Sequence, residues 1–353
     1  MFLREGLAEV RVSGEEIKLG PGTRRAGFYN RDQVMNRDVT MAVLQILKPR
    51  LYLDGFGGTG VRGIRVAREV GTHSVISEIN RSSFDLIKEN VKKNEVDAEV
   101  YNEPFESIAS KYMFDFIDID PYGSVVPFLD VALSHVRNGG YLGITATDLS
   151  ALTGSAPQKT RRRYGAFIGN DRLRHESGIR LLMSYVAGRA AALDRYTVPI
   201  LSFWKSHYYR IIVRVRNGTG EADKMLKNIS QVNKSSELSP IYRDIPEGPL
   251  WKSVLNSGEV IQAINAGSFE HLDGRSVELM KNLGNEDEMF LFYELSDFAS
   301  HFKRSLPKLE EIMSSISGET GETAYRTHFS PTAVKAHIGS AEFQEIFLAI
   351  SRK

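Results

Sequence analysis

Apolar and polar positions follow two alternating spacings through the first two thirds of the chain. Short apolar runs that end near glycine or aspartate predict strands, and apolar residues three or four positions apart predict helices. The expected strands are residues 51–54, 74–78, 98–101, 114–119 and 141–147, and the expected helices are residues 61–70, 82–94 and 125–136. We expect Gly139 and Gly140 to close the last of these helices. This alternation predicts a parallel α/β sheet.

Two further strands follow a long helix with no helix between them. We expect the helix over residues 171–193 and the strands over residues 198–203 and 208–215. Simple dinucleotide-binding folds end in alternating units, whereas class I methyltransferases end in a hairpin that adds an antiparallel strand. We therefore expect an α/β fold of the class I (Rossmann-like) type, which uses S-adenosylmethionine (AdoMet), with a terminal β-hairpin.

A turn-rich stretch, Asn217-Gly218-Thr219-Gly220, follows the last of these strands. Such a stretch favours a domain boundary. We expect residues 1–220 to form the AdoMet-dependent methyltransferase domain. Residues 221–353 would then form a smaller mixed α/β C-terminal domain, whose detailed fold the pattern does not specify.

The composition is that of an ordinary globular protein, with 42% hydrophobic and 25% charged residues. There are no cysteines, which excludes disulfides and zinc ribbons, and the eight histidines lack ligand spacing, so we expect no metal. No apolar run approaches the roughly 18 residues of a membrane span. The first residues also lack a signal-peptide pattern. We expect a monomeric cytoplasmic protein.

One segment is strongly basic, although the net charge of the whole chain is only +1. Its seven cations are Lys159, Arg161, Arg162, Arg163, Arg172, Arg174 and Arg180. Against them stand Asp171 and Glu176, which leaves residues 158–180 at +5. We expect Lys159 and the three arginines after it to meet nucleic-acid phosphate, and the alternative is a solvated face.

A glycine-rich loop follows the first expected strand. It reads Asp54-Gly55-Phe56-Gly57-Gly58-Thr59-Gly60, and Gly55, Gly57 and Gly60 match the dinucleotide-binding pattern GxGxxG. The loop could serve NAD or AdoMet, or be a tight turn with no ligand. Glu78 at the end of the second strand could accept ribose hydroxyls of either cofactor. Asp54 favours AdoMet, because methyltransferases place an acid there near the methionine ammonium.

The fourth expected strand ends in Asp118-Ile119-Asp120-Pro121-Tyr122-Gly123. Ligands of open α/β sheets bind beyond this edge. If the acceptor is the exocyclic amine of a guanine, its nitrogen is a poor nucleophile, and Asp120 could accept its N–H and take the proton. Pro121 would stiffen the turn and Tyr122 would stack on the base. The alternative for Asp120-Pro121-Tyr122 is an ordinary turn. Asp118 would point the same way as Asp120 and support it.

These residues resemble the tRNA guanine-N2 dimethyltransferase family, which modifies guanosine 26. The similar segments are residues 28–30, 36–38, 120–124, 127–130, 139–148, 162–166, 175–180, 248–251 and 326–329. The resemblance covers most of the chain. It implies AdoMet-dependent conversion of guanosine to N2-methylguanosine and then N2,N2-dimethylguanosine, with Asp120 as acid/base. It also implies that Arg37, Arg62 and Glu78 contact AdoMet and that the C-terminal domain helps to hold tRNA.

The chain departs from the family pattern in two places. Many relatives carry a cysteine cluster that resembles a zinc site, and this chain has no cysteine. Relatives also tend to have Asp-Ala after the third strand, where this chain has Pro104-Phe105. We expect the backbone of Phe105, or else Glu103 or Glu106, to read the adenine in its place.

Further site residues are expected from local chemistry. Arg37 could grip the cofactor carboxylate bidentately, although an arginine at a helix start is also common on surfaces. Arg62 lies in the first turn of a helix, where a cation opposes the dipole, and this suggests an anionic partner. Gly58 and Gly60 would let the backbone approach the cofactor. Phe28 and Tyr29 could line a pocket for an extruded base or simply pack in the core.

Three alternative functions stay open on the sequence. An NAD(P)-dependent oxidoreductase could use the glycine pattern, although the terminal strand pair and the Asp120 turn argue against it. The chain could be a catalytically idle RNA-binding protein. A methyltransferase could also act on another amine, because N6-adenine and protein-glutamine enzymes use similar turns.

Overall fold

A computed structural model of the protein describes residues 1–12, 17–18, 27–286 and 289–352. Contacts group the chain into two units, each assembled from separate segments. Unit 1 comprises residues 1–148, 186–226 and 257–281, and unit 2 comprises residues 149–185, 227–256 and 282–353. The units are interleaved along the chain, so this grouping differs from a division at residue 220. That division stays a prediction about which segments fold on their own.

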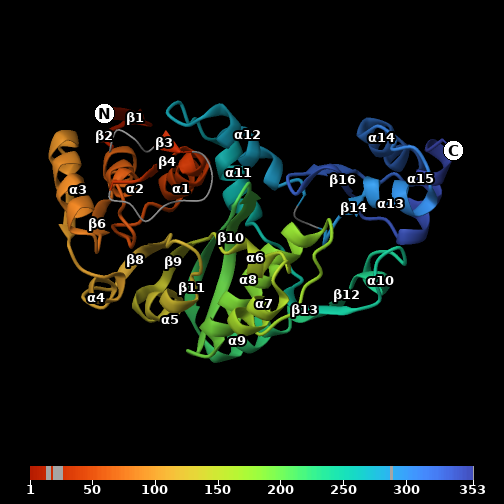
Figure 1. Ribbon diagram of the computed structural model, residues 1–353, viewed down its shortest axis with the longest axis horizontal. Coiled ribbons are helices and arrows are strands. Elements are labelled where there is room, and N and C mark those ends of the chain that lie inside the picture. Colours follow the sequence, from red (N-terminus) through yellow and green to blue (C-terminus); the bar gives the residue numbers. More distant parts are fainter. Residues whose placement is uncertain (13–16, 19–26, 287–288, 353) are drawn as a thin grey trace. The chain divides into compact units, whose positions relative to one another are not determined.

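Unit 1 is built on a seven-stranded sheet with the order β10-β11-β9-β8-β5-β6-β7 (Figure 1). Its strands are β5 (Leu51–Asp54), β6 (His73–Ser77), β7 (Ala98–Tyr101), β8 (Phe114–Ile119), β9 (Val136–Ala146), β10 (Arg195–Lys205) and β11 (Tyr208–Asn217). Strands β5 to β9 pair in parallel, whereas β11 is antiparallel to both β9 and β10. This confirms the expected class I fold with a terminal hairpin.

The strand order reverses direction between β5 and β8. From β5 the chain moves outward to β6 and β7, and it then returns to the other side of β5 to form β8 and β9. The loops that follow β5 and β8 therefore diverge and leave a crevice at the carboxyl edge, where open α/β sheets bind ligands. The glycine-rich loop and Asp120 both lie at this switch point.

Helices cover the parallel part of the sheet. They are α1 (Val34–Leu47), α2 (Val61–Arg65) with a π-helical turn η2 (Val66–Val70), α3 (Arg81–Asn94), α4 (Phe105–Ala109) and α5 (Val126–His135). Helix α3 starts where the Asn80 side chain accepts the Ser83 N–H at 3.1 Å, which is an ordinary N-cap. Strand β8 is buried along nearly its whole length, as expected for a central parallel strand.

One expectation about the glycine pair is wrong. Gly139 and Gly140 do not close helix α5, because β9 already begins at Val136, directly after the helix ends at His135. The pairing of β8 with β9 shifts between Phe114 and Phe116, and Gly139 has a φ of +83°. The glycines therefore form an irregularity inside the strand. An extra residue there adopts a positive φ, which residues with side chains disfavour.

An N-terminal hairpin, which the sequence patterns did not predict, packs on the helices of unit 1. It consists of β1 (Phe2–Glu5) and β2 (Ala8–Arg11). Ala8, Val10 and Val12 share a buried cluster with Ile64 of α2 and Ile87 of α3. Strand β3 (Ile17–Lys18), strand β4 (Tyr29–Asn30) and the 3-10 turn η1 (Arg31–Gln33) lie between the hairpin and α1 in the sequence.

The C-terminal part of the chain contributes to both units. Helices α9 (Thr219–Leu226) and α11 (Gly258–Ala266) contact β10 within unit 1. The long helix α8 (Arg174–Ala191) and helix α12 (Gly274–Leu283) each contain residues of both units. Helix α9 begins inside the stretch that predicted a turn-rich boundary.

Unit 2 is a mixed α/β assembly, which agrees with the smaller C-terminal region that we expected. Its strands form two sheets, β12 (Ile229–Asn233) with β13 (Pro246–Trp251), and β14 (Tyr293–Glu294) with β16 (Ser330–Lys335) and β15 (Tyr325–Thr327). Its helices are α6 (Leu149–Leu152), α7 (Pro157–Tyr164), α10 (Lys234–Glu237), α13 (Leu295–Phe302), α14 (Leu309–Thr320) and α15 (Ser340–Ile350). Stacked rings of Tyr293 and Phe343, 4.0 Å between centroids, lie in its core.

The close packing of α2 on the sheet predicts a position-specific effect of adding one methyl group. A Cβ at Gly63 would lie 2.6 Å from Cγ1 of the buried Ile76, whereas a Cβ at Gly188 in α8 would meet nothing within 4 Å. We expect Gly63→Ala to lose about 1–3 kcal/mol of stability through overpacking. Gly188→Ala should gain up to about 1 kcal/mol from helix propensity. Urea unfolding of both variants measures this, and equal effects would contradict the packing.

Candidate active site

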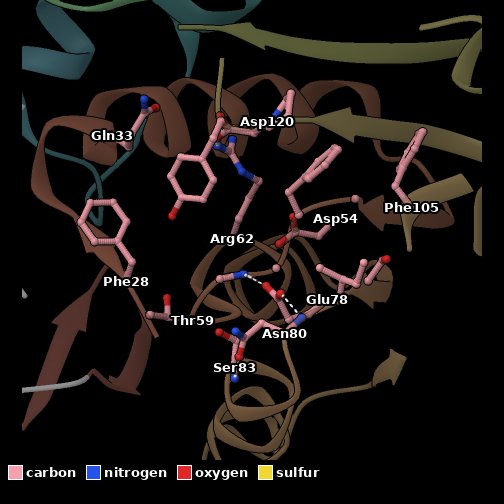
Figure 2. Close-up of a pocket in the computed structure, with 18 of the residues that line it drawn as sticks. Phe28, Gln33, Asp54, Thr59, Arg62, Glu78, Asn80, Ser83, Phe105 and Asp120 are labelled. Carbon is pink, nitrogen blue, oxygen red and sulfur yellow. Dashed lines mark hydrogen bonds and ion pairs between the residues drawn. The ribbon is translucent and has the colours of Figure 1, made fainter. Parts of the chain in front are cut away.

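A cavity of about 790 Å³ opens at the switch point of the unit 1 sheet. Its walls come from the glycine-rich loop, the residues after β6, the start of α4, the turn after β8 and residues 28–37 (Figure 2). The predicted residues in its lining are Phe28, Tyr29, Arg37, Asp54, Gly58, Arg62, Glu78, Phe105, Asp120, Pro121 and Tyr122. Segments far apart in the sequence thus meet around one hollow.

The glycine-rich loop turns tightly between β5 and α2. Gly58 and Gly60 have φ values of +58° and +78°, a backbone that side chains disfavour. Gly60 does not line the cavity itself, and its Cβ would lie 2.8 Å from the side chain of Ile87, so close packing also requires glycine there. The loop therefore presents backbone, and not side chains, to the cavity.

Glu78 follows β6 directly and closes one end of the cavity. Its two carboxylate oxygens accept the Gly58 N–H at 2.9 Å and the Asn80 N–H at 2.7 Å, as the dashed lines in Figure 2 mark. The carboxylate is therefore held by the loop on one side and by the start of α3 on the other. This anchored acid next to a glycine loop is suited to accept hydroxyl donors from a ligand.

Asp54 lies at the end of β5 and is almost completely buried. It accepts the Gly63 N–H at 3.1 Å from the first turn of α2. Burial raises the pKa of Asp54 to about 6, although the nearby Arg62 acts in the opposite direction. A partly desolvated carboxylate of this kind favours a cationic group in the cavity.

Arg62 connects the two acids of the β8 strand end. One of its terminal nitrogens pairs with Asp120, and the other lies 3.5 Å from Asp118 Oδ2. Figure 2 shows its side chain extending from α2 toward Asp120. The Arg62 side chain is buried, whereas that of Asp120 is 20% exposed. The guanidinium thus offsets part of the repulsion between the two carboxylates.

Asp118 is anchored more deeply by a second arginine. Both of its oxygens accept from Arg210 of β11, at 2.8 and 2.6 Å, and Tyr52 Oη donates to it at 3.2 Å. Burial alone would raise the pKa of Asp118, but Arg210 and Arg62 hold it below its ordinary value. Asp118 is therefore a fixed charge. Its supporting role for Asp120 stays a prediction.

Asp120 differs from Asp118 in its titration. Burial raises the pKa of Asp120, Arg62 opposes that effect, and the charge of Asp118 adds to the rise. A carboxylate with a raised pKa is a stronger base than an ordinary aspartate. The strand end therefore combines one acid with a lowered pKa and one with a raised pKa.

Aromatic side chains form two groups on the cavity wall. Phe28 and Tyr122 lie 6.3 Å apart between ring centroids, and Tyr122 is half exposed. Phe105 at the start of α4 stacks on Phe56 at 5.5 Å. Figure 2 shows Phe28 and Phe105 on opposite sides of the cavity. Each of the two aromatic groups could pack against one flat ring.

Arg37 and Tyr29 are engaged more deeply than expected. Arg37 donates to both carboxylate oxygens of Glu5, at 2.7 and 2.6 Å, and Tyr29 Oη donates to the same carboxylate. Tyr29 is thus mostly a structural residue, although it lines the cavity. Arg37 lines the cavity as well.

The basic run lies on helix α7 in unit 2. Arg161 and Arg162 are exposed, Arg163 is half-buried, and Lys159 donates to Ser150 Oγ at 2.9 Å. Arg180, which added to the positive count of the segment, is buried and bonds Glu176 and backbone carbonyls. The exposed charge is therefore smaller than the sequence suggested, and its contact with phosphate stays a prediction.

No group of three or more His, Cys, Asp or Glu side chains among the described residues is arranged to hold a metal ion. No helix within the described part of the chain is long and apolar enough to cross a bilayer.

The chain is similar to known proteins over nearly its whole length. The model of a family described as N2,N2-dimethylguanosine tRNA methyltransferase matches residues 6–348. A tRNA (guanine(26)-N(2))-dimethyltransferase from Thermoplasma volcanium is 46% identical over 100% of both chains. One from Thermoplasma acidophilum is 46% identical over 95% of this chain and 94% of its own. The chain belongs to the N2,N2-dimethylguanosine tRNA methyltransferase family.

A solved structure of a related protein supports the same assignment. Trm1 from Pyrococcus horikoshii, in complex with S-adenosyl-L-methionine, matches with a TM-score of 0.87 and 28% identity over 100% of both chains. The chain belongs to a methyltransferase family, so the interpretation of the GxGxxG pattern as a nicotinamide-binding loop is wrong. The predicted family resemblance is confirmed.

Sequence reasoning about this family member missed several residues of the site. Gln33, Thr147 and His207 line the cavity. Glu5 binds Arg37, and Arg210 binds Asp118. Arg210 carried a usable signal, since an arginine inside the apolar run 208–215 must find an acid if it is buried. Glu5 carried none, because a glutamate near the start of a chain is expected to be exposed.

The Asp118–Arg210 pair predicts a strong and pH-dependent loss in Arg210→Met. Removing one partner of a buried ion pair costs about 3–5 kcal/mol. Because the pKa of Asp118 is lowered in the folded state, the pair stabilises fully at neutral pH and its contribution is lost as the pH falls through that lowered pKa. The difference between variant and wild type should therefore shrink in acid.

Urea unfolding at neutral and acidic pH tests this expectation. Arg189→Met is the matched control, since Arg189 also grips an acid, Asp130, with two nitrogens but on an exposed surface. It should cost less than about 1 kcal/mol. A loss for Arg210→Met that stays constant with pH would contradict the electrostatic explanation.

Proposed function

We propose that the protein transfers methyl groups from AdoMet to the exocyclic N2 amine of guanosine 26 in tRNA. The product is first N2-methylguanosine and then N2,N2-dimethylguanosine, and Asp120 acts as the acid/base. The observation that carries the proposal is the raised-pKa carboxylate of Asp120, which lines a cavity at the switch point of a methyltransferase fold. Family membership supports the reaction and the substrate.

The charge of the cavity fits AdoMet. Two arginines, Arg37 and Arg62, face four carboxylates, Asp54, Glu78, Glu106 and Asp120, which is a formal balance of −2 in the lining. AdoMet carries a sulfonium, an ammonium and a carboxylate and is therefore a net cation. A nicotinamide dinucleotide carries a pyrophosphate and is an anion, which this lining would repel.

In our proposal, different lining residues bind different groups of the cofactor. Glu78 accepts the ribose hydroxyls, and the Gly58–Gly60 backbone lies along the ligand. Asp54 faces the ammonium, and Arg37 and Arg62 serve the carboxylate. The Phe105 ring and backbone serve the adenine, since Pro104-Phe105 leaves no side-chain acceptor at that position. When bound, AdoMet supplies an electrophilic methyl on a sulfonium that needs no further activation.

The protein's contribution to the chemistry is orientation and proton acceptance. The lone pair of the guanine amine is delocalised into the ring, so the nitrogen must be aimed at the methyl and its N–H drawn to an acceptor. Asp120 is that acceptor. Tyr122 and Phe28 offer ring faces for the base, and Pro121 restricts the turn that carries them. The proton released on transfer passes to Asp120, whose raised pKa favours its uptake.

Recognition of tRNA requires more than the cavity. A base in folded tRNA must leave its stack to reach an enclosed methyl donor, so we propose that guanosine 26 is extruded. Arg161, Arg162, Arg163 and Lys159 on α7 contribute phosphate contacts, which add affinity without sequence preference. We further propose that the enzyme works in the cytoplasm as a monomer.

Asp120→Asn should lower the rate of methyl transfer by about 10²–10⁴-fold, because an amide cannot take the proton. Binding of tRNA should persist. The measurement is nucleoside mass spectrometry of an unmodified tRNA transcript incubated with enzyme and AdoMet. Asp130→Asn on α5, an exposed aspartate, is the matched control and should keep its activity. Transfer by Asp120→Asn at the wild-type rate would refute the acid/base role.

Removing the exposed charges of α7 should weaken tRNA binding in a salt-dependent way. For the double variant Arg161→Gln with Arg162→Gln, we expect the slope of log K against log salt to fall by roughly 1 to 2. Lys88→Gln with Lys92→Gln removes the same charge from the exposed face of α3 and should change the slope less. Filter binding at several salt concentrations measures both slopes. Identical slopes for the two variants would reject α7 as the phosphate contact.

A further inference from the structure

A buried carboxylate of the N-terminal hairpin connects that hairpin to the cavity. Glu5 ends β1, and its side chain is only 5% exposed. It accepts hydrogen bonds from Arg37, from Tyr29 and, at 2.7 Å, from Arg65 Nη1. Burial alone would raise the pKa of Glu5, but Arg37 and Arg65 lower it to about 2. Glu5 is therefore a fixed charge at any physiological pH.

The hairpin holds Glu5 in place through several backbone contacts. The N–H groups of Glu9 and Arg11 donate to Asn94 and Asn90 of α3 at 2.9 and 2.7 Å. The Leu7 N–H donates to Glu69 at 3.0 Å. At Gly6, with φ +55°, a Cβ would lie 2.2 Å from a Glu69 oxygen, so the turn is seated closely on this side chain. The Glu5 carboxylate thus has little freedom to move.

Glu5 determines the orientation of the Arg37 guanidinium. Arg37 uses Nε and Nη2 on the two Glu5 oxygens, and Nη2 also donates to the Asn30 carbonyl at 3.0 Å. A bidentate grip fixes the plane of a guanidinium as well as its position. No hydrogen bond from the described residues engages Nη1 of Arg37, and Arg37 lines the cavity. One edge of the guanidinium is thus fixed by the hairpin and the other remains for a ligand.

We propose that Glu5 is a positioning residue for the cofactor, which acts by holding Arg37 so that its remaining nitrogen meets the carboxylate of AdoMet. This rests on the proposed function, because it requires AdoMet in the cavity. The negative charge of Glu5 by itself weakens the attraction of Arg37 for an anion. Positioning and simple electrostatics therefore predict opposite signs when Glu5 loses its charge.

The test compares two ligands that differ only in the carboxylate. S-adenosylhomocysteine carries it, and decarboxylated S-adenosylhomocysteine keeps the ammonium but lacks it. For Glu5→Gln we expect the affinity for S-adenosylhomocysteine to fall roughly tenfold, or about 1.4 kcal/mol. The affinity for the decarboxylated ligand should change less than about twofold. Isothermal titration calorimetry measures both without any turnover.

Glu69→Gln is the matched control for the stability of the hairpin. Glu69 holds the Leu7 N–H and Arg65 but makes no contact with Arg37. Glu69→Gln should lower the melting temperature as Glu5→Gln does, but it should cause no selective loss of S-adenosylhomocysteine binding. If Glu5→Gln does not fold, Glu5→Asp takes its place, since it keeps the charge but withdraws it by one carbon from Arg37. It should show the same selective loss to a smaller degree.

The outcomes separate the inference from the proposed function. Wild-type protein that fails to bind S-adenosylhomocysteine would overturn the proposed function itself. Wild-type protein that binds it, with Glu5→Gln binding it equally well or more tightly, would overturn only the positioning role. Equal losses for both ligands, or the same selective loss in Glu69→Gln, would also overturn that role, because they indicate a general loosening of the hairpin.

Discussion

The Arg62 guanidinium, shared between Asp118 and Asp120, is the interaction on which the site depends. Two carboxylates separated by a single residue at the end of a buried strand repel one another, and a buried cation offsets this repulsion. Arg210 and Arg62 lower the pKa of Asp118, whereas burial and the charge of Asp118 raise the pKa of Asp120. This difference between the two acids supports the proposed role of Asp120 in proton transfer.

The sheet topology explains why these charges meet a ligand. The reversal of strand order between β5 and β8 opens a crevice, and the glycine-rich loop, Glu78 and Asp120 all follow strands that end there. The hairpin adds Glu5 from the N-terminal side of the chain, and β11 adds Arg210 from the far side of β9. Each ion pair in this region joins segments that only the folded sheet brings together.

The sequence predicted the parts of this arrangement that are local. The five parallel strands, the terminal pair, the glycine-rich loop and the Asp120 turn follow from short-range periodicity and from strand-end chemistry. The prediction for Gly139 and Gly140 was wrong. Glycine with a positive φ occurs both at helix ends and at irregularities in strands, so the residue alone does not distinguish them. Glu5 and the interleaved contact units were not predictable, since they depend on contacts between distant segments. A buried ion pair of Arg210 could have been predicted, because Arg210 is a cation inside an apolar strand.

The central claim is that the protein methylates the N2 amine of guanosine 26. The most direct measurement uses two tRNA transcripts that differ only in having guanosine or inosine at position 26, because inosine lacks that amine. Each is incubated with enzyme and AdoMet, and its nucleosides are analysed by mass spectrometry. The mechanism predicts N2,N2-dimethylguanosine in the first transcript and no added methyl group in the second. Equal methylation of both transcripts would contradict it.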